Sequence, residues 1–200
     1  MQRLVVIGNG MVGHRFCERL VELGLRREFE VTVLCEEPRP AYDRVHLSEF
    51  FAGLGAEELA LTSRDWYQEH GLDLQLGRAA VEIDRARREV VAKGGERFGY
   101  DALVLASGST PFVPPIPGVE LGGVFLYRTI DDLGAIRAWA RNAQRAAVIG
   151  GGLLGLEAAK AVLDLGLEAH VIEFADRLMP RQLDRTGAAL LRDAIEALGV

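Results

Sequence analysis

"RLVVIGNGMVGHRFCERL", residues 3–20, carries the spacing G-x-G-x-x-G directly after a short apolar run. The run Leu4–Ile7 is rich in β-branched residues and predicts a buried strand. Apolar residues then recur with helical spacing over Met11–Leu23. In such a strand–turn–helix unit the glycines permit a tight turn, close approach of a pyrophosphate and close helix packing. The stretch therefore predicts a dinucleotide-binding turn with its glycines at Gly8, Gly10 and Gly13.

A second stretch of the same kind, "RAAVIGGGLLGLEAAKAV", occupies residues 145–162. It predicts a strand over Ala146–Ile149 and a helix over Leu156–Leu165. Its motif glycines are Gly150, Gly152 and Gly155. One G-x-G-x-x-G is weak evidence in a chain with 23 glycines among 200 residues, but two complete units are strong evidence. Two units predict two dinucleotides, and the simplest pair is a bound flavin and a nicotinamide that reduces it.

An acidic residue follows the next predicted strand in both units. About 20 residues after the glycines, such an acid is placed to bind the ribose hydroxyls of an adenosine. In the first unit the strand over Glu30–Leu34 leads to Glu36 and Glu37, and both remain candidates. In the second unit Glu173 follows directly, and its carboxylate predicts a preference for NADH because it repels a 2′-phosphate. Arg177 is expected to soften that repulsion.

The intervening sequence predicts further strands and a domain boundary. Residues 62–77 indicate a helix capped by Thr62 or Ser63 and then a strand, and residues 79–108 alternate short strands with turns. Four prolines within 111–117 indicate a stiff connector. We therefore expect domains at 1–117 and 118–200. The second domain shows only two of the three strands of a dinucleotide-binding half, so we expect the chain to be part of a longer protein.

Composition narrows the classes of partner. The net charge of −6 argues against nucleic acid and anionic membrane as partners. No apolar run reaches the roughly 18 residues of a transmembrane helix, and the N-terminus indicates a core strand instead of a signal peptide, so we expect a cytoplasmic protein. Cys17 and Cys35 belong to no metal or redox spacing pattern and are expected to be small core residues.

Seven stretches together resemble the FAD-dependent pyridine nucleotide–disulfide oxidoreductase superfamily over nearly the whole chain. They are "VVIGNGMVGHRF", "CEEPRPAYDRVHLSEFFAG", "YDALVLASGS", "PFVPPIPG", "YRTIDDLGAI", "VIGGGLLGLEAAKAV" and "HVIEFADRLMPRQLD". Within that superfamily, "GNGMVGHRF", "AYDRVHLSEFF" and "EFADRLMPRQLD" resemble the large subunits of NAD(P)H-dependent assimilatory nitrite reductases. The resemblance implies an α/β fold with two Rossmann-like domains, FAD then NAD, of three-layer ββα/βαβ type and truncated at the C-terminus.

The resemblance also implies which residues hold the cofactors. For FAD it implies that the pyrophosphate lies at Gly8, Asn9, Gly10, Met11, Val12 and Gly13. It implies contact of Glu36 with the adenosine ribose and of Ala80 with the adenine. Arg44 and Arg128 would lie near the flavin, and Ser107 and Gly108 would line the cofactor channel. For NAD(P)H it implies Gly150, Gly152, Gly155, Glu157 and Glu173. Arg44 is also compatible with a charge on a surface loop, Arg128 with an ordinary salt bridge, and Ala80 with an ordinary strand. Related reductases often carry a lysine where this chain has Glu49, so the role of that lysine is not carried over.

The activity implied by the resemblance is transfer of electrons from NAD(P)H through FAD to siroheme and a 4Fe-4S cluster, which reduce nitrite to ammonia. Those two groups are expected only beyond residue 200, so no catalytic acid, base or metal ligand is expected here. A small subunit and a homodimer are further expected partners. Two alternatives share both glycine motifs: a stand-alone NADH:rubredoxin or ferredoxin reductase, and a non-catalytic FAD/NAD-binding sensor.

Overall fold

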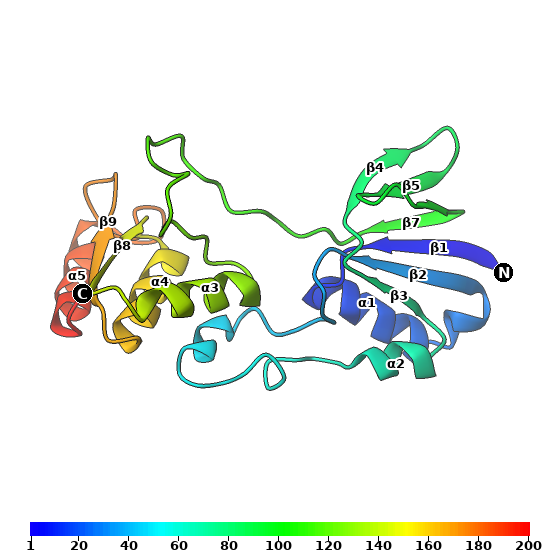
Figure 1. Cartoon of the computed structure of the whole chain (residues 1–200), viewed down its shortest axis with the longest axis horizontal. Coiled ribbons are helices and arrows are strands. Elements are labelled where there is room, and N and C mark those ends of the chain that lie inside the picture. Colours follow the sequence, from blue (N-terminus) through cyan, green and yellow to red (C-terminus); the bar gives the residue numbers. More distant parts are fainter. The chain divides into compact units, whose positions relative to one another are not determined.

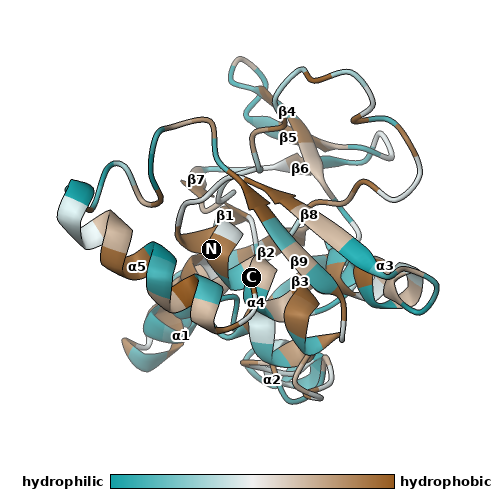
Figure 2. Ribbon diagram, turned by 90° about the vertical axis from the view of Figure 1, so that its left-hand side faces the viewer, coloured by the Kyte–Doolittle hydropathy of each residue, from teal (hydrophilic) through white to brown (hydrophobic).

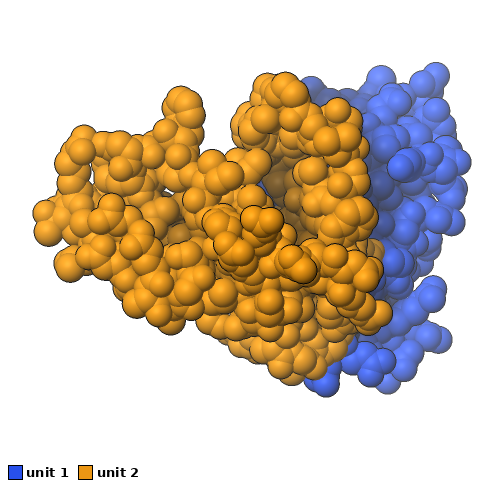
Figure 3. All heavy atoms as spheres, turned by 60° about the vertical axis from the view of Figure 1, so that its left-hand side comes forward, with its two compact units in different colours: residues 1–44, 57–110 blue, residues 45–56, 111–200 orange.

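Both glycine motifs join a strand to a helix, in two separate units of the chain. The computed structural model describes residues 1–200, which divide into one unit of residues 1–44 and 57–110 and a second of residues 45–56 and 111–200 (Figure 3). These bounds differ from the expected 1–117 and 118–200, and the expected cofactor of each domain stays a prediction. None of the helices is long and apolar enough to cross a membrane.

A four-stranded parallel sheet forms the centre of the first unit (Figure 1). Its strands, in spatial order, are β3 (Asp73–Leu76), β2 (Phe29–Cys35), β1 (Gln2–Ile7) and β7 (Ala102–Leu105). The other elements of this unit are α1 (Met11–Glu22), the short 3₁₀ helix η1 (Leu25–Arg27), α2 (Arg64–Glu69) and an antiparallel sheet of β4 (Ala80–Asp84), β5 (Glu89–Ala92) and β6 (Arg97–Gly99).

Residues 4–7 of strand β1 are buried on both faces of the sheet, as the continuous apolar run predicts. Leu4 and Val6 pack with Cys17 and Leu20 of α1, whereas Val5 packs on the opposite face with Val90 of β5. Helices therefore cover one face of the parallel sheet and the antiparallel sheet covers the other. This arrangement confirms the expected α/β class with a three-layer ββα unit.

The second unit contains the repeat of the strand–turn–helix motif (Figure 1). Its elements are the 3₁₀ helix η2 (Leu47–Phe50), α3 (Ile130–Ala140), β8 (Arg145–Ile149), α4 (Leu153–Asp164), β9 (Glu168–Ile172) and α5 (Arg185–Ala197). Strands β8 and β9 pair in parallel and are most hydrophobic at their C-terminal ends, whereas α5 alternates hydrophilic and hydrophobic residues along its length (Figure 2). Val162, Leu167 and Ala169 form the small core between α4 and these strands.

Helix α4 begins one turn earlier than predicted. The expected start was Leu156, but the helix starts at Leu153, directly after its N-cap Gly152. In the first unit α1 likewise starts directly after its N-cap Gly10. The third glycine of each motif therefore lies inside the first turn of its helix. The motif itself sets the helix start, and the apolar periodicity used for the prediction becomes visible only later in the helix.

Candidate dinucleotide-binding turns

The three positions of the first turn are glycine for different structural reasons. Gly8 has a φ of 104°, and a Cβ there would lie 2.1 Å from the carbonyl oxygen of Ala106. A Cβ on Gly13 would lie 2.0 Å from the carbonyl oxygen of Gly8. Around Gly10 the nearest atom to such a Cβ is Nε of Arg44, at 4.0 Å. The fold itself thus requires Gly8 and Gly13, whereas Gly10 keeps a space open in front of the turn.

The second turn repeats this division. Gly150 has a φ of 114°, and a Cβ on Gly155 would lie 1.8 Å from the carbonyl oxygen of Gly150. Gly152 has no atom within 4 Å of the position of its Cβ. In both turns the middle glycine is thus the one that neither a close contact nor a positive φ requires, and it is the one that a pyrophosphate would approach.

Both helix N-termini suit an anion. Gly10 and Gly152 are the N-caps of α1 and α4, and neither helix has a side-chain cap or an acidic residue in its first turn. The first backbone N–H groups therefore remain available, and the helix dipole favours negative charge there. The residues of both turns fit the pyrophosphate of a dinucleotide.

Glu173 binds to the second turn through its carboxylate. It accepts hydrogen bonds from the backbone N–H of Gly151 at 2.6 Å and of Ala175 at 2.8 Å. The bonds from Ala175 and Gly151 lower the pKa of Glu173, so the side chain is ionised at neutral pH. A negative charge therefore stands at the end of β9, beside the glycine turn. Its predicted contact with a ribose remains a prediction.

Glu36 and Glu37 differ in their surroundings at the end of β2. The Glu37 side chain is 16% exposed, forms an ion pair with Arg44 and accepts a hydrogen bond from the Tyr42 hydroxyl at 3.0 Å. Arg39 approaches the same carboxylate at 3.4 Å. Glu36 is exposed. The structure therefore places Arg44 between Gly10 and Glu37, and which of the two acids contacts a ribose stays open.

The remaining predicted residues lie at ends of elements. Ser107 and Gly108 follow β7, and the backbone nitrogen of Ser107 lies 3.0 Å from the position of a Cβ on Gly8. Met11 and Val12 form the first turn of α1, Ala80 begins β4, Arg128 precedes the N-cap of α3, and Glu157 lies in α4. Within the first unit, Ser107 therefore adjoins the glycine turn together with Arg44.

Comparison with known proteins places the chain in a family. The sequence profile of the pyridine nucleotide-disulphide oxidoreductases matches residues 2–200. The chain belongs to this family. Pyridine nucleotide-disulphide oxidoreductases of this kind bind FAD and NAD(P)H, and the two glycine turns are the parts of the chain that fit them.

Relatives within the pyridine nucleotide-disulphide oxidoreductases include two large subunits of nitrite reductases. The chain is 54% identical over 197 residues to the nitrite reductase [NAD(P)H] large subunit of Klebsiella oxytoca, covering 98% of this chain and 21% of that protein. It is 51% identical over 198 residues to the nitrite reductase (NADH) large subunit of Escherichia coli K12, covering 99% and 23%. The chain thus spans about a fifth of the length of these relatives.

Solved structures of the same family share the fold. NADH:rubredoxin oxidoreductase from Clostridium acetobutylicum superposes with a TM-score of 0.89 at 27% identity, covering 100% of this chain and 51% of that one. An NAD-dependent persulfide reductase from A. fulgidus superposes with a TM-score of 0.88 at 32% identity, covering 99% and 39%.

Sequence reasoning missed a buried polar group beneath the first turn. The Tyr67 hydroxyl donates a hydrogen bond of 2.6 Å to Oδ1 of Asn9 and lies 2.9 Å from Nδ1 of His14. Asn9 and His14 are 6% and 4% exposed, and Tyr67 is fully buried. The available signal was a histidine directly after the third glycine, on the apolar side of α1. A lone histidine there does not reveal its partner, because Tyr67 lies more than fifty residues away in sequence.

The two cysteines of the chain are ordinary core residues. Cys17 and Cys35 are 1% and 5% exposed, and burial raises the pKa of Cys17 to about 12 and that of Cys35 to about 11. Both remain protonated at neutral pH and are therefore poor nucleophiles.

Proposed function

We propose that the chain is the flavin-containing electron-input part of an NAD(P)H-dependent nitrite reductase. The observation that carries the proposal is the pair of glycine turns, each with an open middle glycine at an uncapped helix N-terminus. The 54% and 51% identity to nitrite reductase large subunits favours nitrite over other final electron acceptors.

In this proposal the first turn holds the pyrophosphate of FAD. Backbone N–H groups after Gly10 bind the phosphates, and the open space at Gly10 admits them. The Arg44 guanidinium, whose Nε lies 4.0 Å from the position of a Gly10 Cβ, adds positive charge on the same side. Its ion pair with Glu37 fixes that guanidinium at the end of β2.

The second turn holds the nicotinamide dinucleotide. Backbone N–H groups after Gly152 bind its pyrophosphate, and Glu173 accepts hydrogen bonds from the ribose hydroxyls. Because Glu173 is ionised, a 2′-phosphate on that ribose is repelled. We therefore propose that NADH is preferred over NADPH.

The residues of this chain bind and orient, and they transfer no protons to a substrate. When bound, FAD accepts a hydride from NADH and releases electrons singly to one-electron centres. The chain contributes the two turns that bind the dinucleotides and buried thiols that stay protonated.

The remainder of the reaction belongs to parts of the protein beyond residue 200. We propose that siroheme and an iron–sulfur cluster there reduce nitrite to ammonia, in the cytoplasm, with a small subunit and a second copy as partners. The support is the sequence identity to two nitrite reductase large subunits, of whose length this chain covers about a fifth.

A comparison of electron acceptors tests the proposal. The full-length protein is given NADH and either nitrite, rubredoxin or a 2Fe-2S ferredoxin, and ammonia formation and acceptor reduction are followed. We expect NADH-dependent formation of ammonia from nitrite. Fast reduction of rubredoxin without any ammonia would favour the stand-alone reductase, whose solved relative has the same fold. Binding of both dinucleotides without turnover of any acceptor would favour the sensor.

A further inference from the structure

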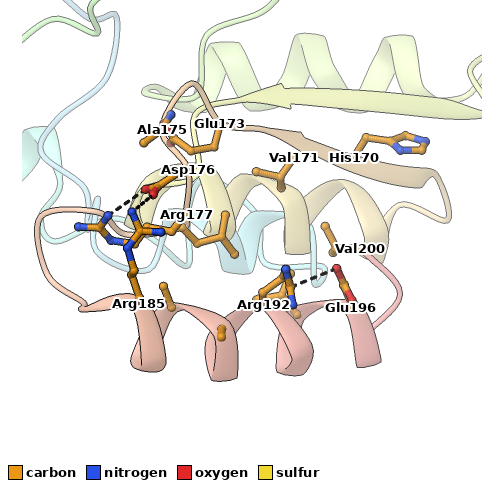
Figure 4. A pocket seen from close by; sticks show the side chains of 14 residues that line it. His170, Val171, Glu173, Ala175, Asp176, Arg177, Arg185, Arg192, Glu196 and Val200 are labelled. Atoms are coloured by element: carbon orange, nitrogen blue, oxygen red, sulfur yellow. Dashed lines mark hydrogen bonds and ion pairs between the residues drawn. The ribbon is translucent and has the colours of Figure 1, made fainter.

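Asp176 bridges two arginines in the loop between β9 and α5. Its Oδ1 accepts a hydrogen bond from Nη1 of Arg177 at 2.9 Å, and its Oδ2 pairs with Nη2 of Arg185 at 2.6 Å. Figure 4 shows both guanidinium groups side by side, directed at this one carboxylate. One acid therefore neutralises part of the charge of two bases.

The bridge lies at the edge of a cavity that also reaches Glu173. The cavity has a volume of about 460 Å³ and is lined by the end of β9, the following loop and one face of α5 (Figure 4). Glu173, Asp176, Arg177 and Arg185 all line it. The two arginines are therefore on the same side of the unit as the carboxylate proposed to bind the ribose.

Arg177 is held in place by more than Asp176. Its Nη2 donates to the carbonyl oxygen of Pro180 at 3.3 Å, and its Nε to that of Leu183 at 3.4 Å. The Arg177 side chain is 30% exposed, whereas that of Arg185 is 81% exposed and is paired with Asp176. Loss of Asp176 would therefore leave Arg177 in position and release Arg185.

The charges of this group sum to zero with Asp176 present. Arg177 and Arg185 contribute two positive charges, and Glu173 and Asp176 contribute two negative ones. A ribose 2′-phosphate carries about two negative charges and finds no net attraction here. Without Asp176 the group has a net positive charge, and two guanidinium groups can donate paired hydrogen bonds to phosphate oxygens.

We infer that Asp176 is a specificity-determining residue: it occupies Arg177 and Arg185 and so keeps them from binding the 2′-phosphate of NADPH. The inference rests on the proposed function, because it assumes that the second turn holds a nicotinamide dinucleotide. It adds a second acidic determinant to Glu173, which acts directly on the ribose, whereas Asp176 acts through the two arginines.

The test is the variant Asp176→Asn in the full-length protein. Equilibrium binding of ADP and of 2′,5′-ADP is measured by calorimetry, because only the second probe carries a 2′-phosphate and neither probe is a redox substrate. We expect the affinity for 2′,5′-ADP to rise roughly tenfold and that for ADP to change less than about twofold. The ratio of kcat/KM for NADPH to that for NADH should rise in parallel.

Two further variants are controls. Asp164→Asn removes an acid of similar exposure, 41% against 48%, that pairs with Lys160 on α4. It should leave both affinities unchanged. Adding Arg177→Gln and Arg185→Gln to Asp176→Asn should abolish the gain for 2′,5′-ADP, since the gain is attributed to those side chains.

The outcomes separate this inference from the proposed function. If ADP binds normally but Asp176→Asn does not improve binding of 2′,5′-ADP, the inference is overturned and the nucleotide site stands. An equal gain in Asp164→Asn would also overturn it, because the effect would then be one of net charge. If the unsubstituted protein binds neither ADP nor NAD⁺, the proposed function fails and the inference with it.

Discussion

The hydroxyl of Tyr67 donates a hydrogen bond to Oδ1 of Asn9, the residue between the first two glycines of the first turn. Because a carboxamide oxygen only accepts, the Tyr67 proton is committed to Asn9, and the phenol oxygen accepts from Nδ1–H of His14. Nε2 of His14 lies 3.7 Å from Glu18. Burial lowers the pKa of His14, so the neutral ring with its proton on Nδ1 is the form that completes this chain of hydrogen bonds at neutral pH.

Tyr67→Phe should weaken the first turn. The change leaves Oδ1 of Asn9 and Nδ1 of His14 without a partner in a buried site, which typically costs about 1–3 kcal/mol. We expect a lower free energy of unfolding in urea and faster loss of FAD from the full-length protein on gel filtration. Tyr100→Phe, at a half-buried position beside the antiparallel sheet, is the matched control. A Tyr67→Phe protein that unfolds and keeps flavin as this control does would contradict the structural role of the bond.

Gly10→Ala should impair FAD binding without loss of stability, whereas Gly13→Ala should lower the stability of the apoprotein. Alanine at Gly10 meets no atom closer than 4.0 Å and is compatible with a φ of −83°, so the apoprotein should keep its stability within about 0.5 kcal/mol. The methyl group occupies the space for the pyrophosphate, so FAD content should fall sharply. Alanine at Gly13 would lie 2.0 Å from the Gly8 oxygen, so the apoprotein itself should be destabilised. Thermal unfolding of apoproteins and flavin content distinguish the two, and equal destabilisation would refute the distinction.

The same substitution in the second turn should separate the two cofactors. Gly152→Ala meets no atom within 4 Å, so folding should be normal. We expect a KM for NADH raised by an order of magnitude or more, with unchanged FAD content, because the methyl group lies in the second turn only. Steady-state kinetics together with the flavin spectrum measure both quantities. Loss of FAD with normal NADH binding would assign the two cofactors the other way round.

Cys17 and Cys35 should resist alkylation in the native protein. With pKa values of about 12 and about 11 they are protonated thiols at pH 8. Peptide mapping after iodoacetamide treatment should show both unmodified in the native protein and both modified in urea. The burial also sets how the free energy of unfolding depends on pH, because unfolded thiols lose their protons near pH 9.0, before the folded ones do. The free energy of unfolding should therefore fall as the pH rises from 9 toward these values, and rapid native labelling at pH 8 would contradict the burial.

The sequence predicted the positions of the turns because their glycines perform local tasks. Gly13 is fixed by its contact with Gly8 and Gly8 by its positive φ, both within one strand–turn–helix unit, so the spacing carries this information. The further contact of Gly8 with Ala106 comes from the distant end of β7 and has no local signal. The expected helix start at Leu156 was wrong by one turn, since helical periodicity locates the middle of a helix better than its end.

The parts of the site that sequence reasoning missed depend on contacts between distant residues. The hydrogen bond from Tyr67 to Asn9 joins positions that no local pattern relates. The sequence likewise does not indicate the Arg44–Glu37 ion pair, because no local pattern predicts the path of the proline-containing loop between the two residues. Asp176 lies next to Arg177 in sequence, but its second partner, Arg185, comes from α5 and became visible only in the fold.

Thiols should take no part in moving electrons out of the flavin. A thiol relay needs accessible thiolates, whereas both thiols of this chain are buried and protonated. The double variant Cys17→Ala and Cys35→Ala should keep its NADH-dependent nitrite turnover within about twofold, with a loss of stability from the two small cavities only. A variant that retains its FAD and its reduction by NADH but loses nitrite turnover would show that a thiol relay exists.

Anaerobic mixing of the full-length protein with NADH tests the central claim most directly. The claim is that one chain holds FAD at the turn of Gly8–Gly13 and NADH at the turn of Gly150–Gly155 so that the nicotinamide reduces the flavin. The predicted result is rapid loss of the visible flavin absorbance, complete once NADH has supplied two electrons per flavin and those taken up by the proposed downstream centres, and strongly slowed in Gly152→Ala at low NADH. A protein that is purified without flavin, or whose bound flavin keeps its absorbance in excess NADH, would contradict the account.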